Sequence, residues 1–348
     1  MGTFWWTMPE TQLDRLRRAG HRRLGTKRSG FRYARADGRA VSAQERERID
    51  ALRVPPAWTH VFIDPSPTAR LQAVGQDAAG RWQYRYHPAF LRRQEARKYA
   101  RLEAFARALP AMRRRVAADL RRPGLPRDKV MACVLRILST AFVRPGSAAY
   151  AEENGSVGLA TLRPKHVKVR GDTVVLDFPG KAKQRQHREV RDRQVASAVR
   201  AMLRVPGKEL FKWVADDGAV VDVRRRSINA YIKEVMGQHF SAKDFRTWAG
   251  TLICACALAR AGRWGKKVAV EAVKETAAEL GNTPAVCRAS YISPSVLSAF
   301  ERGRVVDRYF HDVQELVRHR AAGYHASERA LLRLLRERTG SPPGGAGC

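Results

Sequence analysis

The chain contains three cations and one tyrosine that together could break a phosphodiester bond by covalent catalysis. That chemistry needs a nucleophile, donors for the non-bridging phosphate oxygens and a proton source for the departing oxygen. Tyr291 could be the nucleophile, Arg144 and Arg246 the donors, and Lys181 the acid. Taken alone, each is weak evidence, because most tyrosines are packing residues and most arginines and lysines are surface cations. The charge, the predicted helices and strands and the local motifs must decide whether these residues are catalytic or ordinary packing and surface residues.

The charge of the chain favours a polyanionic partner. The 348 residues include 66 Lys and Arg against 33 Asp and Glu, a formal net charge of +33. This excess is far beyond what solubility requires, and contacts with phosphates would make the affinity strongly dependent on salt. With 44% hydrophobic residues the chain can also build a sizeable core. The composition therefore fits an enzyme or a large binding module that acts on nucleic acid.

The cysteines and the apolar runs indicate neither a metal site nor a membrane segment. The cysteines are odd in number and form no C-x-x-C pair, so we predict no disulfide framework, zinc site or other cofactor. No run of about 18 apolar residues exists to span a bilayer, and the aromatic run at residues 4–6 is too short for a signal peptide. We expect a cytoplasmic, nucleoid-associated protein.

Residues 1–90 have the pattern of a small α+β domain. Ser42 and Glu45 form a capping box that predicts a helix through about Leu52, which the following prolines end. Short β-prone runs separated by turn residues lie at 31–33, 60–63, 70–74 and 82–86.

Helical patterns dominate residues 91–340, which we predict to be a second, mainly α-helical domain. Strands at 166–170 and 173–178, followed by a further polar strand, place Lys181 at or beside a hairpin tip. Gly281 is suited to end a helix in the left-handed conformation. The Gly- and Pro-rich residues 341–348 read as a flexible tail. The predicted helices lie within 93–122 and at 129–142, 192–203, 225–236, 245–261, 268–280, 306–320 and 327–338.

Five motifs in this order resemble those of type IB DNA topoisomerases, in particular the small bacterial and poxvirus-type enzymes. One matching motif would carry no weight, whereas five in order carry a great deal. The resemblance runs from about Phe31 to beyond Tyr291. The motifs are 142–146 (FVRPG), 157–162 (VGLATL), 178–181 (FPGK), 243–248 (KDFRTW), and 281–284 (GNTP) followed by Ser290 and Tyr291.

The resemblance implies the fold that these topoisomerases share with tyrosine recombinases, and a mechanism. Tyr291 would attack the scissile phosphate, giving a 3′-phosphotyrosyl bond and a free 5′-hydroxyl. Arg144 and Arg246 would hold the phosphate oxygens, and Lys181 would protonate the 5′ oxygen. Lys243 matches a family position linked to proton delivery. The reaction would relax supercoils of either sign without ATP or metal.

One residue departs from the family pattern. Where most of the family has histidine in the motif before the tyrosine, this chain has Asn282. An amide can donate a hydrogen bond to a phosphate oxygen but cannot become cationic. We therefore expect hydrogen bonding from Asn282 and not acid–base chemistry.

A second set of residues is predicted to bind DNA. Gln83, Tyr84 and Tyr86 resemble a family segment that touches the major groove, and Gln83 is suited to an adenine edge. Tyr150 falls on another DNA-contacting position of the family. The alternative is an edge strand whose tyrosines pack on a small core. The family shape implies a monomer that closes as a clamp around duplex DNA.

Two other functions compete with this interpretation. Tyrosine recombinases share the catalytic plan, but their second arginine typically follows a histidine by three residues, and here that position is Lys243. The domain at 31–87 also lacks the all-helical pattern of a recombinase core-binding domain. A non-catalytic DNA-binding protein would need only the charge, and it would leave the five motifs unexplained.

Overall fold

The computed structural model describes residues 10–337, so the predicted tail at 341–348 lies outside the described residues. The chain divides into two compact units between Tyr99 and Ala100. The sequence placed the domain boundary at residue 90, close to the start of helix α3 (Pro88–Leu120), and the division falls inside this helix. The predicted mixed α+β fold class is confirmed.

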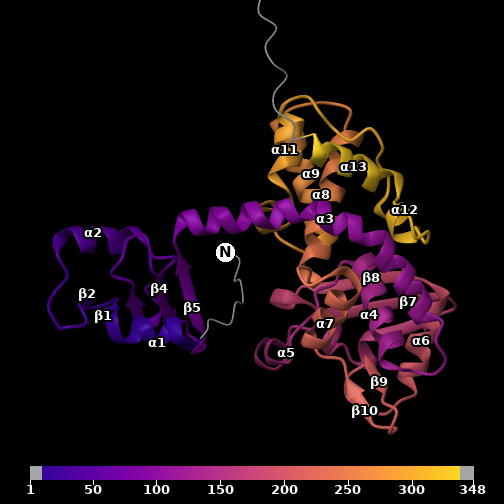
Figure 1. Cartoon of the computed structure of the whole chain (residues 1–348), viewed down its shortest axis with the longest axis horizontal. Coiled ribbons are helices and arrows are strands. Elements are labelled where there is room, and N and C mark those ends of the chain that lie inside the picture. The colour runs from indigo at the N-terminus through magenta and orange to yellow at the C-terminus, as the bar shows by residue number, and fades with distance from the viewer. Residues whose placement is uncertain (1–9, 338–348) are drawn as a thin grey trace, which may run out of the picture. The chain divides into compact units, whose positions relative to one another are not determined.

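The first unit is built on one antiparallel five-stranded sheet with strand order β2-β1-β3-β4-β5 (Figure 1). The Ser42 hydroxyl accepts a hydrogen bond from the Glu45 amide, and the Glu45 carboxylate accepts one from the Ser42 amide at 2.7 Å, so the predicted capping box is confirmed. The elements are α1 (Glu10–Ala19), β1 (His21–Thr26), β2 (Gly30–Ala34), α2 (Ala43–Ala51), β3 (Thr59–Ile63), β4 (Leu71–Gln76) and β5 (Trp82–Tyr86).

Both faces of this sheet are covered by a helix. Val61 and Ile63 of β3 pack with Ile49 of α2, whereas the intervening Phe62 packs with Leu16 of α1. Successive side chains of a strand point to opposite faces, so this alternation fixes the register. A slip of one residue would expose both clusters.

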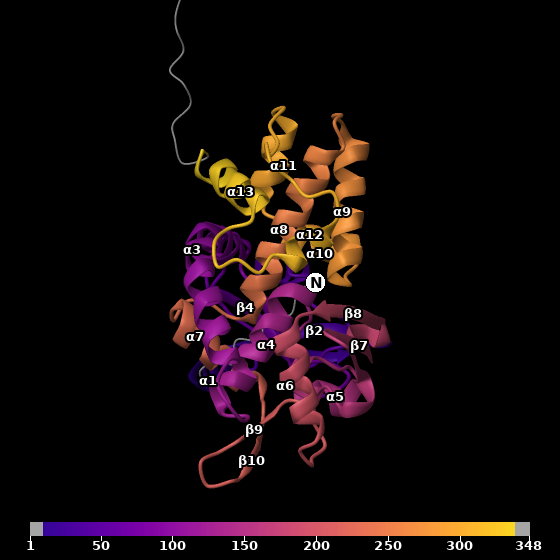
Figure 2. The same ribbon diagram turned by 90° about the vertical axis from the view of Figure 1, so that its right-hand side faces the viewer.

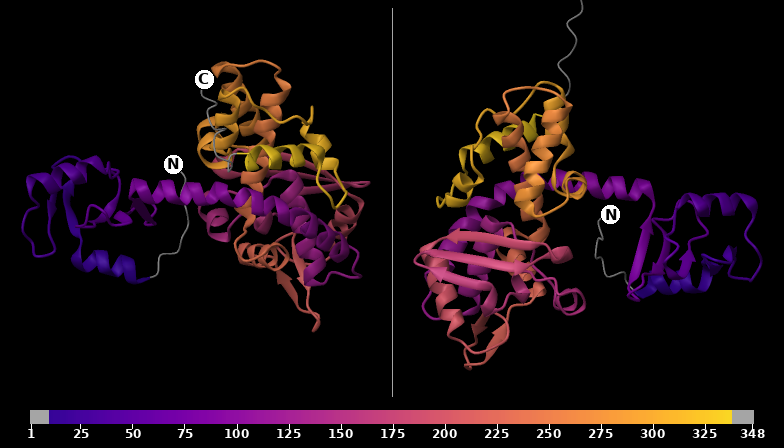
Figure 3. Two further views of the ribbon diagram at one scale, coloured as in Figure 1. Left: turned by 45° about the horizontal axis from the view of Figure 1, so that its top comes forward. Right: turned by 180° about the vertical axis from the view of Figure 1, so that it is seen from behind.

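The second unit contains two small sheets among helices (Figure 2). Helices α4 and α8 are its most deeply buried elements, and α4 and α6 pack against the sheet β6-β7-β8, which Figure 3 shows from behind. The strands are β6 (Val167–Arg170), β7 (Thr173–Pro179), β8 (Arg185–Arg191), β9 (Lys212–Val214) and β10 (Val220–Asp222). The helices are α4 (Arg127–Ala141), α5 (Ala148–Asn154), α6 (Arg193–Leu203), α7 (Arg225–Met236), α8 (Ala242–Arg260), α9 (Lys266–Leu280), α10 (Pro284–Tyr291), α11 (Pro294–Glu301), α12 (Val313–Arg318) and α13 (Ala326–Arg336).

Two helix predictions differ from the structure. The region at 93–122 is one helix, α3, because a buried stripe at helical spacing continues past Pro110 through Met112 and Val116. The predicted helix at 306–320 is only α12, since Val306 and Phe310 are buried without helical structure. In the part of the chain that the structure describes, no helix has the length and apolar character needed to cross a membrane.

Candidate active site

Tyr291 is the last residue of α10, and its backbone is fixed against α8. The Thr251 hydroxyl donates to the Tyr291 carbonyl at 3.2 Å and accepts the Ser293 amide at 3.1 Å. Gly250 allows this approach, because a Cβ atom added there would lie 2.8 Å from the Tyr291 carbonyl oxygen. Helix α8 thus sets the position of the phenol-bearing residue.

Arg246 lies on the same helix, one turn before these contacts, and is only 3% exposed. Its Nη1 donates to the carbonyl of Phe142, which is in the left-handed conformation at the end of α4. Its Nη2 donates to the Leu280 carbonyl at 2.8 Å. The guanidinium carbon lies 5.0 Å from the centroid of the Tyr291 ring, within range of a cation–π contact.

Arg144 follows α4 and reaches the turn after α9. Its Nη2 donates to the Asn282 side-chain oxygen and to the Gly281 carbonyl, the latter at 3.3 Å. The Arg144 carbonyl accepts the Leu159 amide at 3.0 Å. In this assigned orientation the Asn282 amide nitrogen is buried without a hydrogen-bond partner among residues 10–337, so both of its N–H groups remain to donate.

The charges around Tyr291 make its phenol easier to ionise. Burial, the largest influence, raises the pKa of Tyr291, but the charges of Arg246, Arg144 and Lys243 and a hydrogen bond from Arg246 together outweigh it. The net pKa of the phenol is below its ordinary value of 10.0. Burial and the nearby Arg246 charge lower the pKa of Arg144 to about 10. Burial also lowers the pKa of Lys243.

Lys181 is not brought into this cluster. It begins the short 3-10 helix η3 (Lys181–Lys183) at the tip of the β7–β8 hairpin, as its place in the sequence predicted. Its side chain is exposed and has no hydrogen bond or ion pair within residues 10–337. The predicted nucleophile, both arginines, Asn282 and Lys243 therefore come together, whereas the exposed Lys181 side chain makes no hydrogen bond or ion pair with them.

Two residues on β8 that the sequence did not single out also face the site. The Arg188 guanidinium donates to the Glu279 carbonyl at 2.8 Å. Gln186 fills the space beside Gly281, where an added Cβ would lie 2.6 Å from the Gln186 side-chain oxygen. The only sequence signal was that Gln186 and Arg188 are two residues apart on a polar strand after Lys181. A strand exposed to solvent shows the same spacing of polar residues.

The predicted DNA-binding residues of the first unit lie on β5, an edge strand. Tyr84 and Tyr86 are half-buried against the cluster that contains Leu16, and burial raises the pKa of both phenols. Gln83 donates from its side chain to the Asp77 carboxylate at 2.9 Å. This is the packing alternative that the sequence left open for the tyrosines. Tyr150 belongs to α5, but its side chain lies outside the described part.

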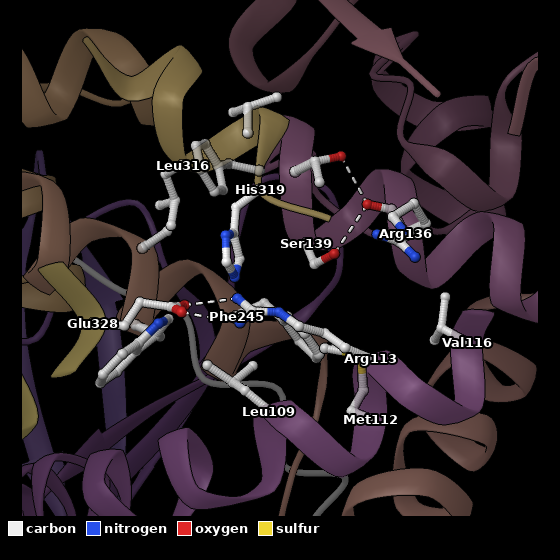
Figure 4. Close-up of a pocket in the computed structure, with 15 residues that line it drawn as sticks. Leu109, Met112, Arg113, Val116, Arg136, Ser139, Phe245, Leu316, His319 and Glu328 are labelled. Atoms are coloured by element: carbon white, nitrogen blue, oxygen red, sulfur yellow. Dashed lines mark hydrogen bonds and ion pairs between the residues drawn. The ribbon is translucent and has the colours of Figure 1, made fainter. Parts of the chain in front are cut away.

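The residues that line a cavity of about 40 Å³ in the second unit do not include Tyr291; Figure 4 shows this cavity. Arg113 from α3 and Glu328 from α13 face each other in it, with two hydrogen bonds at 2.7 and 2.9 Å. Glu328 is 1% exposed, so the pair joins the C-terminal helix to α3 inside the protein. Across the described residues, no three His, Cys, Asp or Glu side chains are grouped so that they could hold a metal ion.

Two family models match the chain. Residues 88–302, which contain every predicted catalytic residue, match the family described as "Eukaryotic DNA topoisomerase I, catalytic core". Residues 30–77 match "Bacterial DNA topoisomerase IB, N-terminal domain". Together the two matches include the sheet strands β2, β3 and β4 and the elements from α3 to α11.

Relatives with known names are similar over most of the chain. DNA topoisomerase 1B of Acanthamoeba polyphaga mimivirus is 33% identical over 273 residues, which cover 75% of this chain and 81% of the relative. DNA topoisomerase 1B of Vaccinia virus (strain Copenhagen) is 23% identical over 279 residues, 77% of this chain and 84% of the relative. A solved structure of XerH site-specific recombinase bound to its difH substrate covers 58% of this chain and 49% of that one, with 12% identity and a TM-score of 0.34.

Proposed function

The chain belongs to the type IB DNA topoisomerase family, and on this premise we propose that it relaxes positive and negative supercoils through a transient single-strand break. One observation carries this proposal. The Tyr291 phenol lies under the Arg246 guanidinium and within the field of Arg144 and Lys243, which lowers its pKa. Such a phenol is prepared to attack a phosphate.

In the proposed reaction the Tyr291 oxygen forms a bond to phosphorus while the bond to the 5′ oxygen breaks. The phenol proton passes to water, and the leaving 5′ oxygen gains a proton from Lys181. Arg144 and Arg246 donate to the non-bridging oxygens, and the free N–H groups of Asn282 add a neutral donor. After strand rotation the 5′-hydroxyl attacks the phosphorus, and the Tyr291 oxygen leaves, which restores the DNA strand. The bond energy is conserved in the phosphotyrosyl bond, so no nucleotide is consumed.

Lys181 must approach the phosphate for its proposed role as the acid. Its exposed position on a hairpin tip leaves its ammonium group available to a bound duplex. We also propose that the face of β5 that carries Gln83 contacts DNA and that the enzyme acts as a monomeric clamp. Tyr150 on α5 would add a contact from the second unit.

Relaxation of a negatively supercoiled plasmid in EDTA, without nucleotide, tests the proposal. We expect unaided relaxation on a plasmid without any special site, and a covalent protein–DNA adduct when denaturant stops the reaction. Peptide mapping should place the adduct on Tyr291, with phosphate on the 3′ end of the cut strand. A recombinase would instead join paired sites, and a binding protein would give salt-sensitive binding with no adduct.

Asn282→Ala is expected to slow single-turnover cleavage by about 10²-fold, as is typical when one donor to an oxyanion is lost. The physical reason is that the Asn282 amide nitrogen has no hydrogen-bond partner within residues 10–337, so the phosphate would supply the acceptor it lacks. Asn282→His should stay active because it restores a donor. Cleavage by the Ala variant at the parental rate would refute the role. Because Arg144 also bonds to the Asn282 oxygen, thermal unfolding of each variant is the control.

A further inference from the structure

The C-terminal end of α9 is capped by arginines from three different elements. Backbone amides of Gly281 and Asn282 satisfy the carbonyls of Ala278 and Ala277, as is usual where a glycine ends a helix. Within residues 10–337 no backbone amide bonds to the next three carbonyls, because the helix has ended. They accept from side chains instead: Glu279 from Arg188 at 2.8 Å, Leu280 from Arg246 at 2.8 Å, and Gly281 from Arg144 at 3.3 Å.

This arrangement brings three like charges together at the negative end of a helix. Burial is the main cause that lowers the pKa of Arg144 and of Arg188, and the charge of Arg246 lowers both further, so the three guanidinium groups act on one another. The carbonyls and the helix dipole oppose this repulsion. Arg144 and Arg246 are already assigned to the phosphate, so Arg188 is the member of the group without a role.

Arg188 belongs to the hairpin that carries Lys181, here defined as β7, η3 and β8 and called the Lys181 hairpin. Gln186 and Arg188 are two residues apart on β8, so their side chains share one face of the strand, and both contact the end of α9. Gln186 also lies against Gly180, the residue before Lys181, where an added Cβ would be 2.7 Å from the Gln186 Cγ atom. The contacts therefore run from the end of α9 to the residue next to Lys181.

We propose that Arg188 is a positioning residue, which docks the Lys181 hairpin on the C-terminal end of α9 and so sets the acid relative to the two catalytic arginines. The Lys181 side chain has no contact of its own within the described residues that could do this. Its location depends on how the hairpin is held, and Arg188 is the charged residue on the hairpin face that meets the helix end. This inference rests on the proposed function, because it assigns a role in the same reaction.

The test compares an oxygen and a sulfur leaving group. A duplex with a mapped cleavage site is made with either the natural 5′-bridging oxygen or a 5′-bridging sulfur. A thiol has a pKa of about 8.5, so a thiolate departs without an acid. Arg188→Met should slow single-turnover cleavage of the oxygen duplex on the order of 10²-fold, as expected for a misplaced acid. Most of that loss should disappear on the sulfur duplex, and Lys181→Ala should show the same pattern.

Arg185→Met is the matched control. Arg185 is on the same strand but on its other face, where it pairs with Asp177 at the neighbouring strand. Arg185→Met changes the net charge by the same amount as Arg188→Met. It should leave the cleavage rates on the oxygen and sulfur duplexes within a few-fold of the parental rates. If Arg188→Met folds poorly, Arg188→Lys is measured on both duplexes instead. The ratio of the oxygen-duplex rate to the sulfur-duplex rate in one preparation is independent of the fraction of active protein.

Three results would overturn the proposal: parental rates for Arg188→Met, an equal loss on both duplexes, or no sulfur rescue of Lys181→Ala. Each of them is observed with a parental chain that forms the adduct, so the proposed function would stand. If the parental chain forms no adduct on either duplex, the proposed function fails and this inference falls with it.

Discussion

Tyr291→Phe is expected to abolish the covalent adduct and plasmid relaxation while leaving DNA affinity nearly unchanged. The substitution removes one oxygen, and no other described group shares its place under the Arg246 guanidinium. Loss of a nucleophile removes the covalent route entirely, so the rate should fall below detection. The measurement is denaturant-trapped adduct on labelled duplex, beside a binding titration at fixed salt.

Tyr309→Phe is the control for the loss of a phenol. Tyr309 is 38% exposed and its ring contacts His311, away from the cluster around Tyr291. This variant should relax plasmid at the parental rate. A Tyr291→Phe protein that still forms a denaturant-stable adduct would show that another residue is the nucleophile, and the assignment of the site would be wrong.

Arg246→Gln is expected to lower the single-turnover cleavage rate by about 10³-fold or more, in the range seen when an arginine that stabilises a phosphoryl transition state is lost. Two effects add. The phosphate loses a charged donor, and the pKa of Tyr291 rises because the cation that lowers it most is gone. The rate of the variant should therefore reach its plateau at a higher pH than the parental rate. Measurement of cleavage across pH tests both effects.

Arg246→Gln should also lower the free energy of unfolding, because the carbonyls of Phe142 and Leu280 lose a buried charged donor. An unpaired buried carbonyl costs about 1–3 kcal/mol, which a thermal unfolding curve would detect. Arg260→Gln is the matched control, since Arg260 lies at the far end of the same helix and pairs with Glu275. Parental cleavage by Arg246→Gln would remove Arg246 from the mechanism.

Local sequence signals predicted the elements that they specify directly. The Ser42 capping box, the glycine end of α9 and the hairpin that carries Lys181 were all found where the sequence placed them. Strand β1 was missed although it has a neighbouring strand on each side, because only His21 at its start is buried and its residues show no alternation. Its two partners define it: β2 follows it directly in the chain, whereas β3 is remote in sequence.

The sequence predicted which four residues lie together, but not how the fold holds them. The motifs gave Arg144, Arg246, Asn282 and Tyr291, and these residues lie together. The anchoring of the arginines on backbone carbonyls at the end of α9 has no sequence signature, because every residue type has the same carbonyl group. Arg188 was missed for the same reason. Its partner is the carbonyl of Glu279, which only the fold brings near.

The loop that begins at Arg144 closes on itself before the chain moves on. Gly146 and Gly158 touch so closely that a Cβ atom on Gly158 would lie 2.5 Å from the Gly146 Cα atom, and the Ala160 amide bonds to the Pro145 carbonyl at 2.8 Å. Helix α5 therefore lies in a loop whose two ends are held together at Gly146 and Gly158. We therefore expect the length of the segment around Tyr150, within residues 147–156, to vary without moving Arg144, whereas Gly146 and Gly158 are fixed by their contact.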